Sequence, residues 1–293
     1  MSWTKRAEPY IFILPAAVLM LLFLGYPLVY NIGISFFRWQ LAFADRPFAG
    51  LRNYTSILSG NVFGRVVLNT AMWTVGGVCL QMAVGILLAV MVDGMRRGSS
   101  RVMQSLILLP WIIPGVVTSV IWMCMLQSDL GVVSYLINAL GGTDRSVLWF
   151  SDTRLALISV IMVNTWKAMP FWFLMITAAL MDVPRDQVEA ARIDGARQIA
   201  VFRHVILQHL KPVIAATATL TTIWTFNSFD IIWTITRGGP LNATATLPVY
   251  TYLLGFTTNN FGQASAMAVI SVLIVAAVCA PYIRALYRKV RES

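Results

Sequence analysis

The sequence contains few charged residues. Asp, Glu, Lys and Arg together make up 12% of the 293 residues, whereas an average soluble domain contains about 25%. Hydrophobic residues make up 58%, and the mean hydropathy is +0.73. A single soluble core of this length cannot bury so much apolar surface, so the composition excludes an ordinary soluble protein and indicates an integral membrane protein.

Cysteine and histidine are also scarce. Cys79, Cys124 and Cys279 all lie in apolar stretches, which excludes a disulfide framework. No cluster of acids or cysteines accompanies His204 or His209, so we expect no metal site. The sequence also lacks the phosphate-binding pattern G-x-x-x-x-G-K-[ST]. We therefore expect that this chain neither hydrolyses ATP nor binds a cofactor.

Six apolar stretches are long enough to cross a bilayer, which takes roughly 20 helical residues. No internal repeat separates them, and the first is too long for a signal peptide and is not followed by a cleavage pattern. Pro110 and Pro114 are expected to kink the third stretch. The sequence therefore predicts an all-α integral membrane protein with a single domain over residues 1–293. Its six transmembrane helices are expected at 10–37, 66–92, 102–127, 155–181, 213–235 and 262–286.

The basic residues predict how the chain is oriented. The net charge is +10, and in membrane proteins excess Lys and Arg mark the cytoplasmic loops, so a nucleic-acid partner is not expected. The two termini and alternate loops hold fourteen basic residues, and the other loops hold seven. We therefore expect both termini to be cytoplasmic, an arrangement that requires an even number of spans.

A long polar segment, residues 182–211, separates the fourth and fifth apolar stretches. Asp182 and Pro184 favour a helix start, and Gly195 permits a bend that other residues resist. The sequence predicts a compact knob of two short helices, with Phe202, Val205 and Ile206 facing apolar neighbours. From the residues alone, a solvated amphipathic loop without a partner remains an alternative.

Several motifs along the chain resemble one family in order and spacing. They are Asn164-Thr-Trp-Lys-Ala-Met-Pro-Phe171, Leu180-Met-Asp-Val-Pro184, Glu189-Ala-Ala-x-x-Asp-Gly-Ala196 and Thr236-Arg-Gly-Gly-Pro-x-Asn242. The chain resembles the carbohydrate-uptake permeases of ATP-binding-cassette (ABC) importers, the maltose, lactose and glycerol-3-phosphate type, over nearly its whole length. One departure is Gln208 after Leu207, where that family usually has Leu-Pro. The missing proline leaves the end of the polar segment less sharply defined.

The resemblance implies a type I importer permease fold and a set of partners. These are a second homologous permease subunit, two ATPase subunits that bind ATP and Mg²⁺, and an extracytoplasmic solute-binding protein. The polar segment would be the cytoplasmic EAA coupling loop, which docks into an ATPase. The residues that carry this expectation are Glu189, Ala190, Ala191, Asp194 and Gly195. The protein would be a multi-pass component of the cell inner membrane, surrounded by lipid.

Polar residues on two predicted helices indicate a solute path. In each helix they recur at i, i+3, i+4 and i+7, a spacing that places them on one face. Their hydroxyl and amide groups suit the hydroxyls of a carbohydrate, and their aromatic rings suit its apolar face. Asn227 and Asp230 lie beside the second face. The complete set is Asn164, Lys167, Ala168, Phe171, Thr221, Trp224, Thr225, Asn227, Ser228 and Asp230.

Lys167 and Asp230 attract attention because an ionisable residue inside a span is costly and suggests a path or a pair. They either face an aqueous cavity or each other, and Lys167 would then favour an anionic solute. Alternatively, Lys167 extends toward the membrane surface and Asp230 caps a helix end. The threonines of the fifth stretch also have a second interpretation, since small hydroxylated residues pack membrane helices together.

We therefore expect a permease subunit, not an enzyme, that translocates a sugar or sugar derivative in an ATP-driven, binding-protein-dependent importer. A permease for another solute, such as a glycerophosphodiester, is the first alternative. A self-sufficient secondary carrier would leave the long polar segment unexplained. A membrane scaffold would leave the two polar helix faces unexplained. The sequence names neither the sugar nor the partner subunits.

Overall fold

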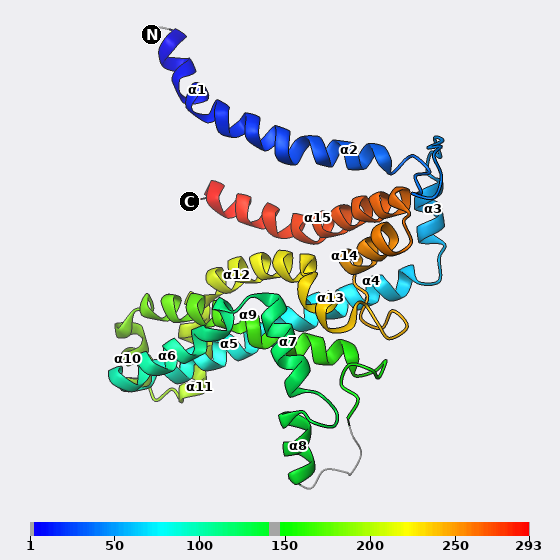
Figure 1. Ribbon diagram of the computed structural model, residues 1–293. Coiled ribbons are helices and arrows are strands. Elements are labelled where there is room, and N and C mark those ends of the chain that lie inside the picture. The colour runs from blue at the N-terminus through cyan, green and yellow to red at the C-terminus, as the bar shows by residue number, and fades with distance from the viewer. Residues whose placement is uncertain (1–2, 141–146, 293) are drawn as a thin grey trace. The chain divides into compact units, whose positions relative to one another are not determined.

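The computed structural model describes residues 3–140 and 147–292, and in these ranges the regular secondary structure is helical, with two isolated β-bridges. The chain divides into two compact units. Unit 1 comprises Met1–Phe63 and Tyr250–Ile274, and unit 2 comprises Gly64–Val249 and Val275–Ser293. Each unit is described separately below, with the helix labels of Figure 1.

Unit 1 contains a long apolar helical run and a short helix beyond it. The run passes from α1 through a π-helical turn, η1, into α2, and its side chains from Phe12 to Ile34 are largely exposed, as expected of a helix that faces lipid. Asn53 closes the following loop, because its Nδ2 donates to the carbonyls of Ser35 (2.8 Å) and Phe37 (2.9 Å). The elements are α1 (Trp3–Met20), η1 (Leu21–Gly25), α2 (Tyr26–Ile34), α3 (Arg52–Leu58), η4 (Leu253–Thr257) and the first part of α15 (Phe261–Glu292); α14 (Leu247–Tyr252) straddles the boundary.

Unit 2 contains a helical core around α5 and α9. These helices pack closely at Gly85, where any side chain would overlap Trp172. Trp172, Phe173 and Ile176 are fully buried there. The elements of this unit are α4 (Phe63–Ala71), η2 (Met72–Gly76), α5 (Gly77–Asp93), α6 (Arg97–Ile112), α7 (Gly115–Met125), α8 (Val132–Ala139), α9 (Ala156–Met181), α10 (Arg185–Ile193), α11 (Gln198–Val201), η3 (Phe202–Ile206), α12 (Leu207–Asn227) and α13 (Asp230–Thr236).

The described residues include five helical runs that are long and apolar enough to cross a membrane. A sixth is present if the bent pair Gly98–Ile112 and Gly115–Met125 forms one span. The predicted all-α, multi-pass class is therefore confirmed. The five runs are Phe12–Ile34, Phe63–Asp93, Ala156–Met181, Gln198–Thr236 and Phe261–Ala280.

Two of the expected spans are interrupted. The third, at 102–127, bends by 102° between α6 and α7, because Ile113 and Pro114 adopt extended conformations. Pro114 also lacks a backbone N–H, so it cannot donate the helical hydrogen bond at this position, although α6 continues through Pro110. The fifth, at 213–235, stops at Asn227, where Ser228 is extended, and a new helix starts at Asp230.

Candidate functional site

A cavity of about 150 Å³ lies among five helices of unit 2. Nine of the ten residues predicted for the solute path line it, and Asn227 does not. The Nδ2 of Asn227 instead donates to the carbonyl of Ile223 within its own helix, at 2.8 Å. The lining residues are Gln81 (α5), Trp111 (α6), Asn164, Lys167, Ala168 and Phe171 (α9), Thr221, Trp224 and Thr225 (α12), Ser228, and Asp230 and Ile231 (α13).

The helical spacing explains why these residues meet. Asn164, Lys167, Ala168 and Phe171 occupy one face of α9, which packs against α5, α6, α12 and α13. Ser228 does not continue the face of α12, because it lies in the break before α13. The wall near Thr225 is fixed by Trp73, whose Nε1 donates to the Thr225 carbonyl at 2.7 Å.

Two amide side chains of the cavity wall have buried atoms without hydrogen-bond partners. Gln81 is 0% exposed, and neither its Nε2 nor its Oε1 is paired. The Nδ2 of Asn164 is also unpaired. Buried polar atoms in proteins are almost always satisfied, so exceptions that border a cavity need an explanation. These atoms are enclosed in the wall, so a ligand or water can pair with them only when the wall moves.

Aromatic rings form an apolar part of the same wall. The ring centroids of Phe171 and Trp224 lie 4.9 Å apart, with an angle of 59° between the ring planes. The ring centroids of Trp111 and Phe171 lie 5.9 Å apart, with an interplanar angle of 41°. Trp224 is 52% exposed, so much of its surface is free to contact a ligand. Rings beside amides and hydroxyls match a sugar, whose ring has apolar faces and a polar edge.

Both ionisable residues of the predicted path also line the cavity. Lys167 donates from Nζ to the Ile113 carbonyl at 2.9 Å, where α6 ends. Asp230 belongs to the first turn of α13, and its Oδ1 accepts a hydrogen bond from the Ser228 hydroxyl at 3.4 Å. The structure therefore places the two residues around one cavity and gives Lys167 a backbone acceptor.

Gln81, Trp111 and Ile231 also line the cavity but were not predicted from the sequence. These residues lie on α5, α6 and α13, whose approach to α9 is a tertiary feature that spacing within one helix does not reveal. Gln81 did carry a signal, because it is the one amide in the apolar sequence of α5. Trp111 and Ile231 carried none, since apolar residues are abundant throughout the chain.

The polar segment 182–211 forms the expected knob of short helices. The first helix, α10, begins at Arg185, and Asp182 instead ends α9, three residues earlier. Phe202, Val205 and Ile206 are partly buried, as predicted, and Arg203 is exposed. No break follows Leu207, because α11, η3 and α12 are contiguous, consistent with the absence of proline at position 208.

Gly195 ends α10 in the left-handed conformation, with φ +81°. The Gly195 N–H donates to the Arg192 carbonyl and the Ala196 N–H donates to the Ala191 carbonyl, both at 3.0 Å. This is the Schellman arrangement, in which glycine is favoured because a Cβ is strained at this φ. The bend predicted at Gly195 is therefore present and depends on this residue type.

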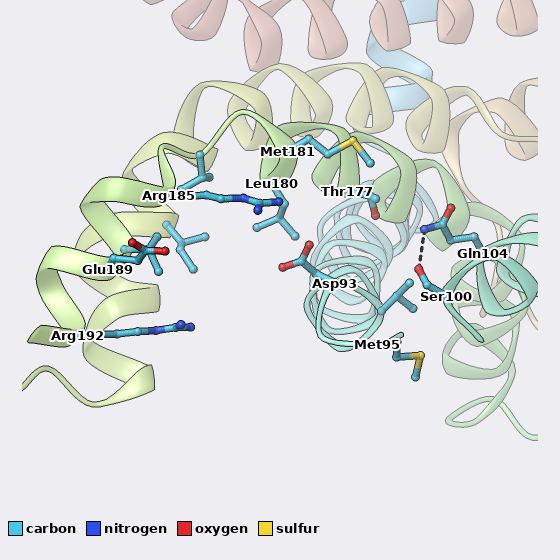
Figure 2. A pocket seen from close by; sticks show the side chains of 14 residues that line it. Asp93, Met95, Ser100, Gln104, Thr177, Leu180, Met181, Arg185, Glu189 and Arg192 are labelled. Atoms are coloured by element: carbon cyan, nitrogen blue, oxygen red, sulfur yellow. Dashed lines mark hydrogen bonds between the residues drawn. The ribbon is translucent and has the colours of Figure 1, made fainter. Parts of the chain in front are cut away.

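One face of α10 borders a second cavity, of about 580 Å³ (Figure 2). Arg185, Glu189 and Arg192 follow the spacing of one helix face and line this cavity opposite Asp93, the last residue of α5. The cavity also contains Thr177, whose hydroxyl is buried and unpaired. Glu189, which we expected to contact an ATPase, thus lies on the face that looks toward α5 and α6.

The tip of the knob exposes apolar residues. Ile193 is 85% exposed and Ile199 is 81% exposed, and Ala190, Asp194 and Gly195 are exposed around them. Ala191 is partly buried. A contiguous apolar patch on an otherwise polar surface marks a contact with a partner, whereas single exposed aliphatic residues are common. The two isoleucines were missed because an amphipathic segment was expected to bury its apolar residues against its own chain.

Comparison with known proteins identifies the relatives of this chain. The profile of the family described as "Binding-protein-dependent transport system inner membrane component" matches residues 81–292. A probable ABC transporter permease protein of Sinorhizobium fredii is 40% identical over 279 residues, covering 94% of this chain and 89% of the relative. The diacetylchitobiose uptake system permease protein of Streptomyces coelicolor is 30% identical over 289 residues, covering 97% and 88%.

Solved structures share the fold. A chain of a bacterial ABC transporter involved in the import of the acidic polysaccharide alginate has a TM-score of 0.82 and 21% identity, covering 97% of both chains. The alginate transporter in complex with an alginate pentasaccharide-bound periplasmic protein gives a TM-score of 0.81, covering 95% of this chain and 94% of the other. The type I importer permease fold expected from the motifs is therefore confirmed.

Proposed function

The chain belongs to the family of binding-protein-dependent transport system inner membrane components, and from this premise we propose that its cavity passes a sugar across the membrane. The observation that carries the proposal is the wall of the cavity. Unpaired amide atoms of Gln81 and Asn164 lie beside the rings of Phe171 and Trp224. Sugars present hydroxyls and apolar ring faces that match these two kinds of surface.

The cavity of about 150 Å³ is the part of the pathway that this chain contributes. The diacetylchitobiose permease relative supports a small saccharide or its derivative as the solute. The amide-rich wall favours a sugar over a glycerophosphodiester, which has fewer hydroxyls to pair with it.

The knob supports an ATPase as the source of energy. Its exposed Ile193 and Ile199 surround the Gly195 bend, and docking into an ATPase cleft would bury them. Hydrolysis of ATP then takes place in two partner subunits that bind ATP and Mg²⁺. A second permease subunit completes the pathway, and an extracytoplasmic binding protein delivers the solute. With the knob on the cytoplasmic side of the inner membrane, both termini are cytoplasmic as well.

A self-sufficient secondary carrier is the alternative from a different functional class. Such a carrier needs no docking knob, so its surface should be polar where this chain exposes two isoleucines. The same uptake experiment separates the two functions, because only the importer depends on ATP and on additional subunits.

The test is uptake by proteoliposomes that contain this chain with the products of its neighbouring genes. Labelled diacetylchitobiose, trehalose and maltose are supplied outside with the binding protein, and ATP is enclosed inside. We expect ATP-dependent uptake of at least one sugar and its loss in Ile193→Asp, whereas Ile193→Val, which keeps an apolar surface, retains it. Uptake by this chain alone without ATP would contradict the importer. An assembled, ATP-hydrolysing complex that takes up no sugar would contradict the solute class.

A further inference from the structure

The third span is broken where it reaches the solute cavity. α6 ends at Ile112, α7 begins at Gly115, and the two helices bend by 102° at this point. A broken helix leaves carbonyl groups without partners at one end and N–H groups without partners at the other. These ends carry partial negative and partial positive charge, so a cation stabilises the first and an anion stabilises the second.

Lys167 and Asp230 supply one charge to each end. The Nζ of Lys167 donates to the carbonyl of Ile113, directly after α6, at 2.9 Å. The carboxylate of Asp230 lies against Gly115, the first residue of α7, so closely that any Cβ at position 115 would overlap its Oδ2. The two residues come from different helices, α9 and α13, and each charge is next to the helix end that its sign stabilises.

The same two residues are the ionisable side chains among those that line the cavity. The other polar groups of the wall, including Gln81, Asn164 and Thr221, are uncharged amides and hydroxyls. One positive and one negative charge therefore face the cavity together. An anionic or cationic solute is attracted by one of them and repelled by the other, and it must also lose its hydration.

We propose that Lys167 and Asp230 are a charge-matched pair that holds the two ends of the broken span around the cavity and selects a solute without net charge. This inference rests on the proposed function, since it names the solute class of the same site. With only one of the two residues present, the cavity would favour a charged solute. Lys167 without Asp230 favours an acidic sugar, and Asp230 without Lys167 favours a sugar that carries an amine.

The charge balance is measured with a thiol placed in the cavity wall. Ala168→Cys is introduced after Cys79, Cys124 and Cys279 are replaced with alanine, and the permease is purified with its partner subunits. The reaction rates of the thiol with the anionic sulfonatoethyl and the cationic trimethylammonioethyl methanethiosulfonate are each divided by the rate with free cysteine. The ratio of the two normalised rates reports the electrostatic potential in the cavity.

We expect a ratio within about three-fold of one when both charges are present. Asp230→Asn is expected to raise the anionic-to-cationic ratio about ten-fold, Lys167→Met to lower it about ten-fold, and the double variant to return it near one. Ser228→Asp adds a negative charge to the wall and keeps both Lys167 and Asp230, although it replaces the hydroxyl that donates to Asp230 Oδ1. It should lower the ratio as Lys167→Met does, even if the other variants fail to assemble.

An unchanged ratio in all of the variants would overturn the proposal, and so would a parent ratio far from one. A thiol that reacts with neither reagent would also overturn it, because solute-sized molecules would then not reach the wall. The measurement requires no solute. A transporter with the expected ratios that imports no sugar would therefore contradict the proposed function and leave the charge pairing established.

Discussion

Replacing Gln81 with methionine is expected to stabilise the empty protein and to weaken its response to solute. Gln81 is fully buried, and both of its amide atoms lack partners. Leaving a buried polar group unpaired costs about 1–3 kcal/mol, and methionine has nearly the same shape without that cost. Gln81→Met should therefore raise the free energy of unfolding by about 1–3 kcal/mol.

The same substitution removes a donor and an acceptor that would pair with the sugar once the wall opens around it. Two hydrogen bonds of about 1 kcal/mol each correspond to a roughly thirty-fold weaker response. The assay is thermal unfolding of the purified complex, together with ATP hydrolysis stimulated by the loaded binding protein over a range of sugar concentrations. The sugar used is whichever one the proteoliposomes take up.

Gln104→Met is the matched control. Gln104 donates from Nε2 to the Ser100 hydroxyl at 3.1 Å, and it lies outside the solute cavity. Its replacement should not stabilise the protein, because a hydrogen bond is lost, and should leave the sugar response unchanged. A Gln81→Met protein that is less stable than the parent, or that responds normally to sugar, would refute the reasoning about the unpaired amide.

Three further substitutions test the contacts around the two sites. Gly115→Ala should destabilise the complex by about 1–3 kcal/mol because its Cβ overlaps the Asp230 carboxylate. In an Asp230→Ala background the same substitution should leave the stability almost unchanged. Equal losses of stability in both backgrounds, measured by thermal unfolding, would argue against the contact. Gly195→Ala should strain the end of α10 by about 1–2 kcal/mol and reduce the amount of ATPase recovered with the tagged chain. Gly195→Asn should have a smaller effect, since asparagine tolerates positive φ. Equal recovery of the ATPase with the parent and with both variants would contradict this prediction. Trp224→Ala should raise the sugar concentration for half-maximal ATP hydrolysis about ten-fold, equivalent to about 1.4 kcal/mol. Trp224→Phe should stay close to the parent. An unchanged response in Trp224→Ala would show that the ring does not contact the sugar.

Most residues predicted for the solute path line one cavity, and helical spacing brings them together because the largest contribution comes from one helix face. Asn164, Lys167, Ala168 and Phe171 lie on α9, a regular helix of 26 residues, so their positions follow from its geometry. The break before Asp230 did not follow from the sequence, since neither proline nor glycine occurs near Ser228. In the third span, Pro110 and Pro114 predicted a kink, but the size of the bend, 102°, did not follow from the sequence.

In the knob, the backbone conformation was predictable from the sequence, whereas the direction and exposure of the side chains depend on tertiary packing. The bend at Gly195 was predictable because a left-handed residue strongly favours glycine. The direction of Glu189 was not predictable, since it depends on α10 lying across a cavity from α5 and α6. For the same reason, the exposure of Ile193 and Ile199 emerged only from the arrangement of the helices.

Co-purification tests the central claim most directly. The tagged chain is expressed with its neighbouring genes, extracted in mild detergent and captured, and the associated proteins are identified and quantified by mass spectrometry. The importer predicts stoichiometric recovery of an ATPase and a second permease, lost in Ile193→Asp and retained in Ile193→Val. Recovery of this chain alone, still active in sugar transport, would contradict the account and favour a self-sufficient carrier.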